Sequence, residues 1–287
     1  MPDFKQSVAV ITGAATGIGR ALAARLADDG ARLCLADINK TQLEVEAHGL
    51  RARGGEVVTY TVDVSDRRQM EAFANKAVDH FGRVDLLINN AGVALCGDVE
   101  EVSIADIEWV MGINFWGTVY GVKYFLPILK EQKKAYIVNL SSVFGMIAPP
   151  GEAAYSASKF AVRGFTEALK HELAGTSVQV SSVHPGGIRT GIAKTSRLGA
   201  GADPQKREVD AAKFEFLART SPERAADRII DGLLKGETRI LIGRDASQID
   251  WIQRALPETY WRVLGPLVDW RTSRVTEGDN QPLDTED

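Results

Sequence analysis

Short apolar runs alternate with helical segments along most of the chain. Runs of strand length occur at 7–12, 32–37, 56–64, 84–91, 135–142, 178–185 and 238–243. Helical spacing and strong helix formers predict helices near 17–29, 40–53, 66–81, 103–130, 153–174 and 221–235. Strands that alternate with helices are joined by right-handed crossovers, which put helices on both faces of a parallel sheet. The pattern predicts one α/β domain, residues 1–243, built on a doubly wound parallel sheet of seven strands.

The alternation stops after residue 243, and a helical extension is expected over 244–274. Eight aliphatic or aromatic side chains recur there at helical spacing, together with three tryptophans: Ile249, Ile252, Leu256, Tyr260, Val263, Leu264, Leu267, Val268, Trp251, Trp261 and Trp270. Pro257 and Gly265-Pro266 are expected to divide this amphipathic extension into short pieces. The last segment, 275–287, has five acids and no base, and it is predicted to be a disordered acidic tail.

Two segments could cover a substrate. The apolar face of 246–272 could lie over a pocket, on a partner subunit or on a membrane surface. Residues 244–274 hold five arginines and four acids, whereas a membrane-surface helix usually has a more basic polar face. Packing against protein is therefore favoured over membrane contact. Residues 188–220 are glycine-rich and then charged, which is typical of a mobile substrate loop, with a variable surface loop as the alternative.

Composition narrows the class of protein. The net charge of −4 leaves no basic stripe for a nucleic-acid partner. Two cysteines, Cys34 and Cys96, do not suggest a disulfide framework, which fits a reducing cytoplasm. No cleavable signal is expected, and no apolar run approaches the ~20 residues of a membrane span. No metal site is predicted. These features favour a cytoplasmic protein.

A glycine-rich turn follows the first strand and opens the first helix. Its residues are Gly13-Ala-Ala-Thr16-Gly17-Ile18-Gly19. A strand, a glycine turn and a helix N-terminus together bring backbone N–H groups to a pyrophosphate. The second strand ends in Asp37, where a carboxylate can accept hydrogen bonds from an adenosine ribose diol and repel a 2′-phosphate. NAD is therefore favoured over NADP as the cofactor.

Tyr155-Ser-Ala-Ser-Lys159 pairs a phenol with an ammonium group four residues away. On a helix these two side chains share a face. A phenol has a pKa near ~10, and a neighbouring cation favours the phenolate. The pair therefore predicts a general acid or base at Tyr155, although a half-buried tyrosine beside a solvated lysine would give the same spacing. Ser142 ends a strand thirteen residues earlier, and it can hydrogen-bond a substrate oxygen.

With these features the chain resembles the classical short-chain dehydrogenase/reductase family over roughly residues 5 to 245. The motifs that carry the resemblance occur in the family's order: Thr12-Gly13-x-x-x-Gly17-x-Gly19, Asp63-Val64, Asn89-Asn90-Ala91-Gly92, Asn114, Ser142, Tyr155-x-x-x-Lys159 and Pro185-Gly186 followed by Thr190. The resemblance implies a Rossmann fold and hydride transfer between a nicotinamide cofactor and an alcohol or carbonyl compound.

The family's roles can be carried over to the matching positions. The resemblance implies cofactor contacts at Gly13, Thr16, Gly17, Ile18, Gly19, Asp37, Asp63, Val64, Asn90, Ala91, Gly92, Tyr155, Lys159, Pro185, Gly186, Ile188 and Thr190. It assigns Asp63 to the adenine amino group, although Asp63 could equally cap the next helix. Gly186 is expected to let the backbone approach the nicotinamide. His184, just before Pro185, is interpreted as structural.

The resemblance also implies a catalytic set of Asn114, Ser142, Tyr155 and Lys159. Tyr155 would exchange the hydroxyl proton, Lys159 would lower the phenol pKa and bind the nicotinamide ribose, and Asn114 would hold a water of the proton relay. The expected substrate contacts are Ser142, Tyr155 and an apolar wall of Leu95, Val143, Phe144, Met146 and Ile188. We therefore expect an NAD-dependent oxidoreductase of a hydrophobic secondary alcohol or its ketone, steroid-like or long-chain.

Three further points stay open at this stage. Gly112, Gly117 and Gly121 suggest that another helix approaches 103–130 closely, which favours a homodimer or homotetramer interface there, with tight packing inside the chain as the alternative. The other function classes are a non-catalytic dinucleotide-binding sensor or structural protein, and an epimerase or dehydratase of the family's extended branch. The intact Ser142, Tyr155 and Lys159 argue against the sensor, and the glycine spacing argues against the extended branch.

Overall fold

The computed structural model describes residues 4–276, apart from a few side chains within 204–211 and 271–276. Its main sheet contains β1 (Val8–Thr12), β2 (Arg32–Asp37), β3 (Val57–Thr61), β4 (Leu86–Asn89), β6 (Ala135–Leu140), β7 (Val178–Pro185) and β9 (Arg239–Ile242). The strand order is β3-β2-β1-β4-β6-β7-β9, and every neighbouring pair is parallel. The predicted doubly wound, seven-stranded parallel sheet is confirmed.

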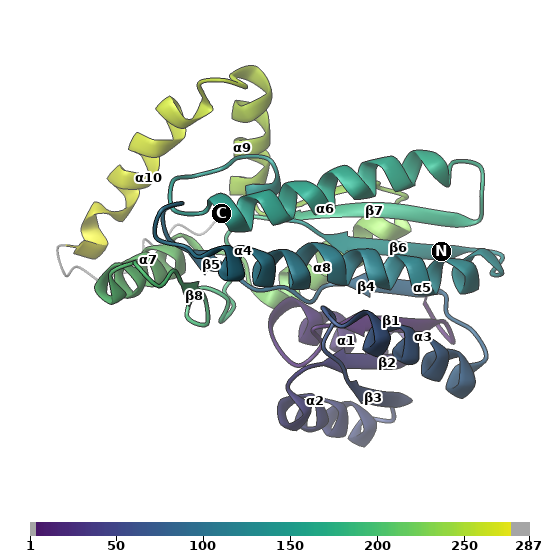
Figure 1. Ribbon diagram of the computed structural model, residues 1–287. Coiled ribbons are helices and arrows are strands. Elements are labelled where there is room, and N and C mark those ends of the chain that lie inside the picture. The colour runs from purple at the N-terminus through teal and green to yellow at the C-terminus, as the bar shows by residue number, and fades with distance from the viewer. Residues whose placement is uncertain (1–3, 277–287) are drawn as a thin grey trace.

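Helices cover both faces of the sheet, and each face has its own apolar cluster (Figure 1). One cluster joins the sheet to α1 (Gly17–Asp28), α2 (Lys40–Ala52) and α8 (Pro222–Leu234). The other joins it to α3 (Arg67–Phe81), α5 (Gly117–Lys130) and α6 (Ala153–Glu172). The crossovers run outward in opposite directions from the β1–β4 pair, so the carboxyl ends of these two strands border the crevice where such sheets bind ligands.

The predicted helix 103–130 is interrupted. It consists of α4 (Ile104–Met111), a π-helical turn, η1 (Gly112–Trp116), and then α5. A methyl group at Gly117 would come within 2.8 Å of Val64, and one at Gly121 would overlap the Asn89 amide. Close packing inside the chain therefore explains these two glycines, and they need no neighbouring subunit. The homodimer or homotetramer stays a prediction.

The segment 188–220 has more regular structure than the sequence suggests. A short strand, β8 (Arg197–Leu198), pairs with β5 (Leu95–Cys96), and α7 (Pro204–Leu217) follows. Asp203 caps α7 through its side chain, with Pro204 at the first helical position. An acidic N-cap residue followed by proline is a recognised start signal for a helix. The glycine-rich sequence just before this signal favoured the prediction of a loop instead.

The extension forms two helices, α9 (Arg244–Ala255) and α10 (Tyr260–Thr276). Pro257 lies between them as predicted, but the expected break at Gly265-Pro266 is wrong, because α10 continues through Pro266. Leu264 and Thr272 on this helix are buried, and its packing against α7 offsets the unfavourable proline. The acidic tail lies outside the described residues, except that α10 reaches Thr276.

The extension and α7 gather beside one end of the main sheet (Figure 1). Five residues of α9 and α10 line the main cavity: Asp245, Ile249, Trp261, Leu264 and Val268. The sequence left three locations for the extension: over a pocket, on a partner subunit or on a membrane surface. In the structure the extension lies over the pocket. Among residues 4–276, none of the helices is both long and apolar enough to cross a membrane.

Candidate active site

The glycine turn lies directly against the end of β4. Gly13 and Gly17 have φ angles of +66° and +55°, a region that glycine enters without strain. A methyl group on Gly13 would lie 2.7 Å from the Ala91 Cα. Asn90 Nδ2 donates to the carbonyls of Thr12 (3.0 Å) and Gly13 (2.9 Å). The second asparagine of the Asn-Asn pair thus holds the turn to the sheet.

The N-terminus of α1 opens towards the cavity. Thr16 is its N-cap residue and makes no side-chain cap, so the first N–H groups of the helix can serve an anionic ligand. Gly19 does not line the cavity. A methyl group at this position would overlap the Gly13 carbonyl, so Gly19 allows the helix to pack under the turn.

Asp37 is fixed at the carboxyl end of β2. Its Oδ2 accepts from Ala15 N–H and its Oδ1 from Asn39 N–H, each at 2.9 Å. Both oxygens keep further lone pairs for a ribose diol. The next side chain, Ile38, is 69% exposed and carries no charge that could bind a 2′-phosphate.

One cavity of about 730 Å³ joins the glycine turn to the tyrosine and lysine. Sixteen of the expected cofactor contacts line it: Gly13, Thr16, Gly17, Ile18, Asp37, Asp63, Val64, Asn90, Ala91, Gly92, Tyr155, Lys159, Pro185, Gly186, Ile188 and Thr190. Asp63 does not cap α3; that cap is Asp66, and Asp63 instead accepts from Ser65 N–H at 2.9 Å. The predicted set is thus brought together, with Gly19 behind it.

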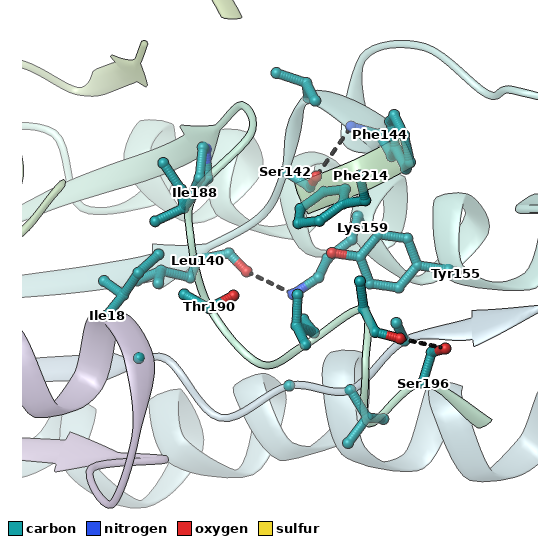
Figure 2. Close-up of a pocket in the computed structure, with 18 of the residues that line it drawn as sticks. Ile18, Leu140, Ser142, Phe144, Tyr155, Lys159, Ile188, Thr190, Ser196 and Phe214 are labelled. Atoms are coloured by element: carbon teal, nitrogen blue, oxygen red, sulfur yellow. Dashed lines mark hydrogen bonds between the residues drawn. The ribbon is translucent and has the colours of Figure 1, made fainter. Parts of the chain in front are cut away.

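Ser142, Tyr155 and Lys159 line the same cavity (Figure 2). Lys159 is 5% exposed, and its Nζ donates to the Leu140 carbonyl at 3.1 Å. The Nζ also lies 5.7 Å from the centre of the Tyr155 ring. Phe144 packs edge-on against that ring, with centroids 6.2 Å apart. Hydroxyl, phenol and ammonium therefore meet in a largely apolar environment.

Burial sets the protonation of these groups. It raises the pKa of Tyr155 above its ordinary value, and the hydrogen bond with Ser142 opposes this rise only in part. Burial also lowers the pKa of Lys159 to about 8. The phenol pKa is therefore not lowered as expected beside Lys159, because the burial of the phenol raises it. At neutral pH the phenol is protonated and can donate its proton.

Asn114 lies behind the cavity wall. Its Oδ1 accepts from Val93 N–H at 2.8 Å, and its Nδ2 donates to Ser158 Oγ at 2.9 Å. Ser158 Oγ in turn donates to the Tyr155 carbonyl at 2.7 Å. The π-helical turn places Asn114 so that it links the β4–β5 connection to the helix that carries Tyr155 and Lys159. A methyl group at Gly92 would lie 3.2 Å from both Asn114 Oδ1 and Lys159 Nζ, so these two polar atoms border one small space.

His184 is fully buried and supports Ser142. Its Nδ1 lies 3.1 Å from the Ser142 carbonyl, and its Nε2 lies 3.0 Å from Ser182 Oγ. Because a carbonyl only accepts, Nδ1 carries the proton. Burial lowers the pKa of His184 to about 4, so the ring is neutral at physiological pH. These contacts agree with the structural role predicted for it.

His184→Asn is expected to make stability less sensitive to acid. The folded-state pKa of about 4 lies below the ordinary 6.5, so the unfolded chain binds the proton first as the pH falls. Stability present above pH 6.5 is then lost towards pH 4, by up to about 3 kcal/mol. Urea unfolding at pH 7 and pH 4.5 checks this, with the exposed His48→Asn as the control. An unchanged pH dependence in His184→Asn would contradict it.

The substrate side of the cavity differs from the predicted wall. Val143, Phe144 and Ile188 line it, but Leu95 and Met146 do not. Leu95 is 1% exposed and packs with Val102 and Val110. Its neighbours Ala94 and Cys96 line the cavity in its place.

Three helices late in the chain, α7, α9 and α10, supply a further part of the wall. Its apolar members from α7, α9 and α10 are Phe214, Leu217, Ile249, Trp261, Leu264 and Val268. Asp245, in the first turn of α9, also lines the cavity. The helical spacing of the extension hinted at a buried face, but no sequence signal indicates which residues reach the cavity.

The residues present fit a nicotinamide dinucleotide. The left-handed glycines leave room beside a helix N-terminus for a pyrophosphate, and Asp37 offers acceptors to a ribose. Ser142, Tyr155 and Lys159 lie at the other end of the same cavity. The fold and the site thus define a dinucleotide-dependent oxidoreductase.

Comparison with known proteins gives the family. The profile of the family described as short chain dehydrogenase matches residues 7–200, and the chain belongs to this family. SadH from Mycobacterium tuberculosis (strain H37Rv) is 42% identical over 267 residues, which covers 92% of this chain and 96% of SadH. The CLA biosynthesis dehydrogenase/reductase of Lactiplantibacillus plantarum is 34% identical over 288 residues, 97% of this chain and 96% of that protein.

Among solved structures, a short chain dehydrogenase/reductase from Burkholderia phymatum in complex with NAD matches the whole chain. It has a TM-score of 0.78 and 35% identity, and the match covers 100% of both chains. The protein is therefore an oxidoreductase that acts on CH–OH groups of small molecules with a nicotinamide dinucleotide.

Proposed function

We propose that this protein interconverts a hydrophobic secondary alcohol and its ketone with NAD, and that Tyr155 is the proton carrier. One observation carries the proposal: Ser142, Tyr155 and Lys159 line the cavity that also contains the glycine turn and Asp37. The nicotinamide, when bound, supplies hydride transfer to or from the carbinol carbon. The chain's own residues hold the oxygen and move its proton.

Each polar group has a separate role in this proposal. The protonated phenol of Tyr155 donates its proton to the oxygen of a ketone, and in the reverse direction the phenolate form takes the proton of the alcohol. Ser142 hydrogen-bonds the same oxygen as charge develops on it. Lys159 and Asn114 border the space beside Gly92, which supports a path for the proton away from the phenol.

The preference for NAD rests on the end of β2. Asp37 provides acceptors for the ribose diol, and its charge would repel a 2′-phosphate. Its position is held by hydrogen bonds from Ala15 and Asn39. The Burkholderia phymatum structure, which contains NAD, supports the same choice.

A hydrophobic substrate is supported by the lining of the cavity. Beyond Ser142 and Tyr155 the wall includes Phe144, Ile147 and Pro149, and α7, α9 and α10 add further apolar side chains. Such a wall removes apolar substrate surface from water at about 25 cal/mol per Å². Activity should therefore rise with the apolar size of the substrate.

A panel of secondary alcohols of increasing chain length tests this function, with NAD reduction followed at 340 nm. We expect kcat/KM to rise about threefold or more for each added methylene until the cavity is full. Sugars and charged hydroxy acids serve as polar controls. No NAD reduction with any alcohol, or a preference for the polar controls, would contradict the proposal.

Leu264→Ala is expected to raise KM for the longest substrate about tenfold, because this cavity-lining side chain is 7% exposed. KM for NAD should change little. Leu267→Ala is the matched control, since Leu267 lies on the same helix but is 44% exposed and does not line the cavity. Equal effects of the two variants would show that α10 does not contact the substrate.

A further inference from the structure

Asp245 joins the extension to the turn that follows β7. It lies in the first turn of α9, and its Oδ2 accepts from the Gly187 N–H at 2.7 Å. The two residues are 58 positions apart in the chain. The carboxylate also lines the main cavity, beside Gly186 and Ile188. An acid of the extension thus holds the backbone that leads to Ile188 and Thr190.

The same carboxylate explains the glycine at position 186. A methyl group on Gly186 would overlap the carboxyl group of Asp245, whose atoms are the three nearest neighbours of that position. Gly186 does not have a positive φ angle, so its backbone would accept alanine. The space beside Gly186 is therefore taken by Asp245, whereas the sequence suggested that glycine is needed there for the approach of a nicotinamide.

The neighbouring glycine has a different reason. A methyl group on Gly187 would lie 2.9 Å from the Ala218 Cα and 3.1 Å from the Leu217 carbonyl. Both of these are backbone atoms at the end of α7, and Asp245 is not among the nearest atoms. The need for glycine at position 187 therefore comes from the end of α7 and not from the Asp245 side chain.

We propose that Asp245 is a positioning residue for cofactor binding, which fixes the 186–190 turn against the start of α9. The inference rests on the proposed dinucleotide function of this cavity. An acid in the first turn of a helix is also favoured by the helix dipole, but that effect needs no bond to Gly187. The bond ties the cofactor side of the cavity to the helix that carries Ile249 on its substrate side.

Two variants separate the hydrogen bond from the charge. Asp245→Ala removes the acceptor, and we expect the Kd for NAD, measured by calorimetry, to rise about tenfold, with a larger change in KM for NAD than in kcat. Asp245→Asn keeps an oxygen acceptor of the same shape, and its Kd should stay within about twofold of the wild type. Wild-type affinity in Asp245→Ala would overturn the proposal, as would equal losses in both variants.

Thermal unfolding without cofactor tests the same contact independently of binding. Gly186→Ala should lower the Tm by about 5 °C in the wild-type background and by less than about 2 °C in the Asp245→Ala background. Gly232→Ala, whose methyl group would meet Ile240 and Arg228 and not Asp245, should lower the Tm equally in both backgrounds. If Gly186→Ala lowers the Tm equally in the wild-type and Asp245→Ala backgrounds, Asp245 does not hold this turn and the proposal fails. A wild-type protein that binds no NAD would instead overturn the proposed function.

Discussion

Tyr155→Phe is expected to lower kcat by about 10²–10⁴-fold, because it removes the phenolic hydroxyl that carries the proton. The ring should stay in place, since Phe144 packs edge-on against it. The Kd for NAD should remain within about twofold of the wild type, because the phenolic oxygen is lost at the end of the cavity away from Asp37. Steady-state kinetics and calorimetry on the same preparation measure both quantities.

Tyr60→Phe is the matched control for this variant. The Tyr60 hydroxyl makes one long contact, 3.4 Å to the Lys76 carbonyl, and Tyr60 packs against Phe73 away from the cavity. The kcat of the Tyr60→Phe variant should equal that of the wild type. If Tyr155→Phe kept more than about a tenth of the wild-type kcat, Tyr155 would not be the essential acid or base.

Asp37→Ala is expected to reduce kcat/KM for NAD by about 10–100-fold. The ratio of kcat/KM for NAD to kcat/KM for NADP should become smaller. The substitution removes the acceptors for the ribose diol and the charge that repels a 2′-phosphate. It also frees the Ala15 and Asn39 N–H groups, which the carboxylate now holds at 2.9 Å each. Kinetics with both cofactors before and after the change give the result.

Asp37→Asn separates the two contributions, because it keeps the shape and one acceptor but removes the charge. We expect Asp37→Asn to raise kcat/KM for NADP by a larger factor than it lowers kcat/KM for NAD. The control is Asp66→Asn, which changes an acid that caps α3 through Arg68 and Gln69. A wild-type protein that prefers NADP would contradict the assignment of Asp37.

The framework of the site was predictable because it depends on local signals. Apolar runs fix where buried strands lie, and residues at the carboxyl ends of parallel strands meet at one edge of a sheet. Asn90 accordingly bonds the Thr12 carbonyl at the end of β1, and Asp37 at the end of β2 accepts from Ala15 in the glycine turn. The pairing of Tyr155 with Lys159 needed only the i, i+4 geometry of a helix.

Predictions that depended on surroundings were less successful. The pKa of Tyr155 is raised rather than lowered, since the burial of a side chain depends on elements distant in sequence. Leu95 was expected in the cavity wall, but the direction in which β5 faces follows from its pairing with β8. Pro266 was expected to end a helix, yet packing of α10 on α7 keeps it helical.

The sequence by itself determined the doubly wound sheet, the glycine turn at its switch point and the order of Ser142, Tyr155 and Lys159. Each of these follows from residue spacing within one or two elements. Only the tertiary structure decided that α7, α9 and α10 close the cavity, and that Asp245 fills the space beside Gly186. The physical reason is that these contacts join side chains far apart in the chain, whose meeting depends on how whole helices pack.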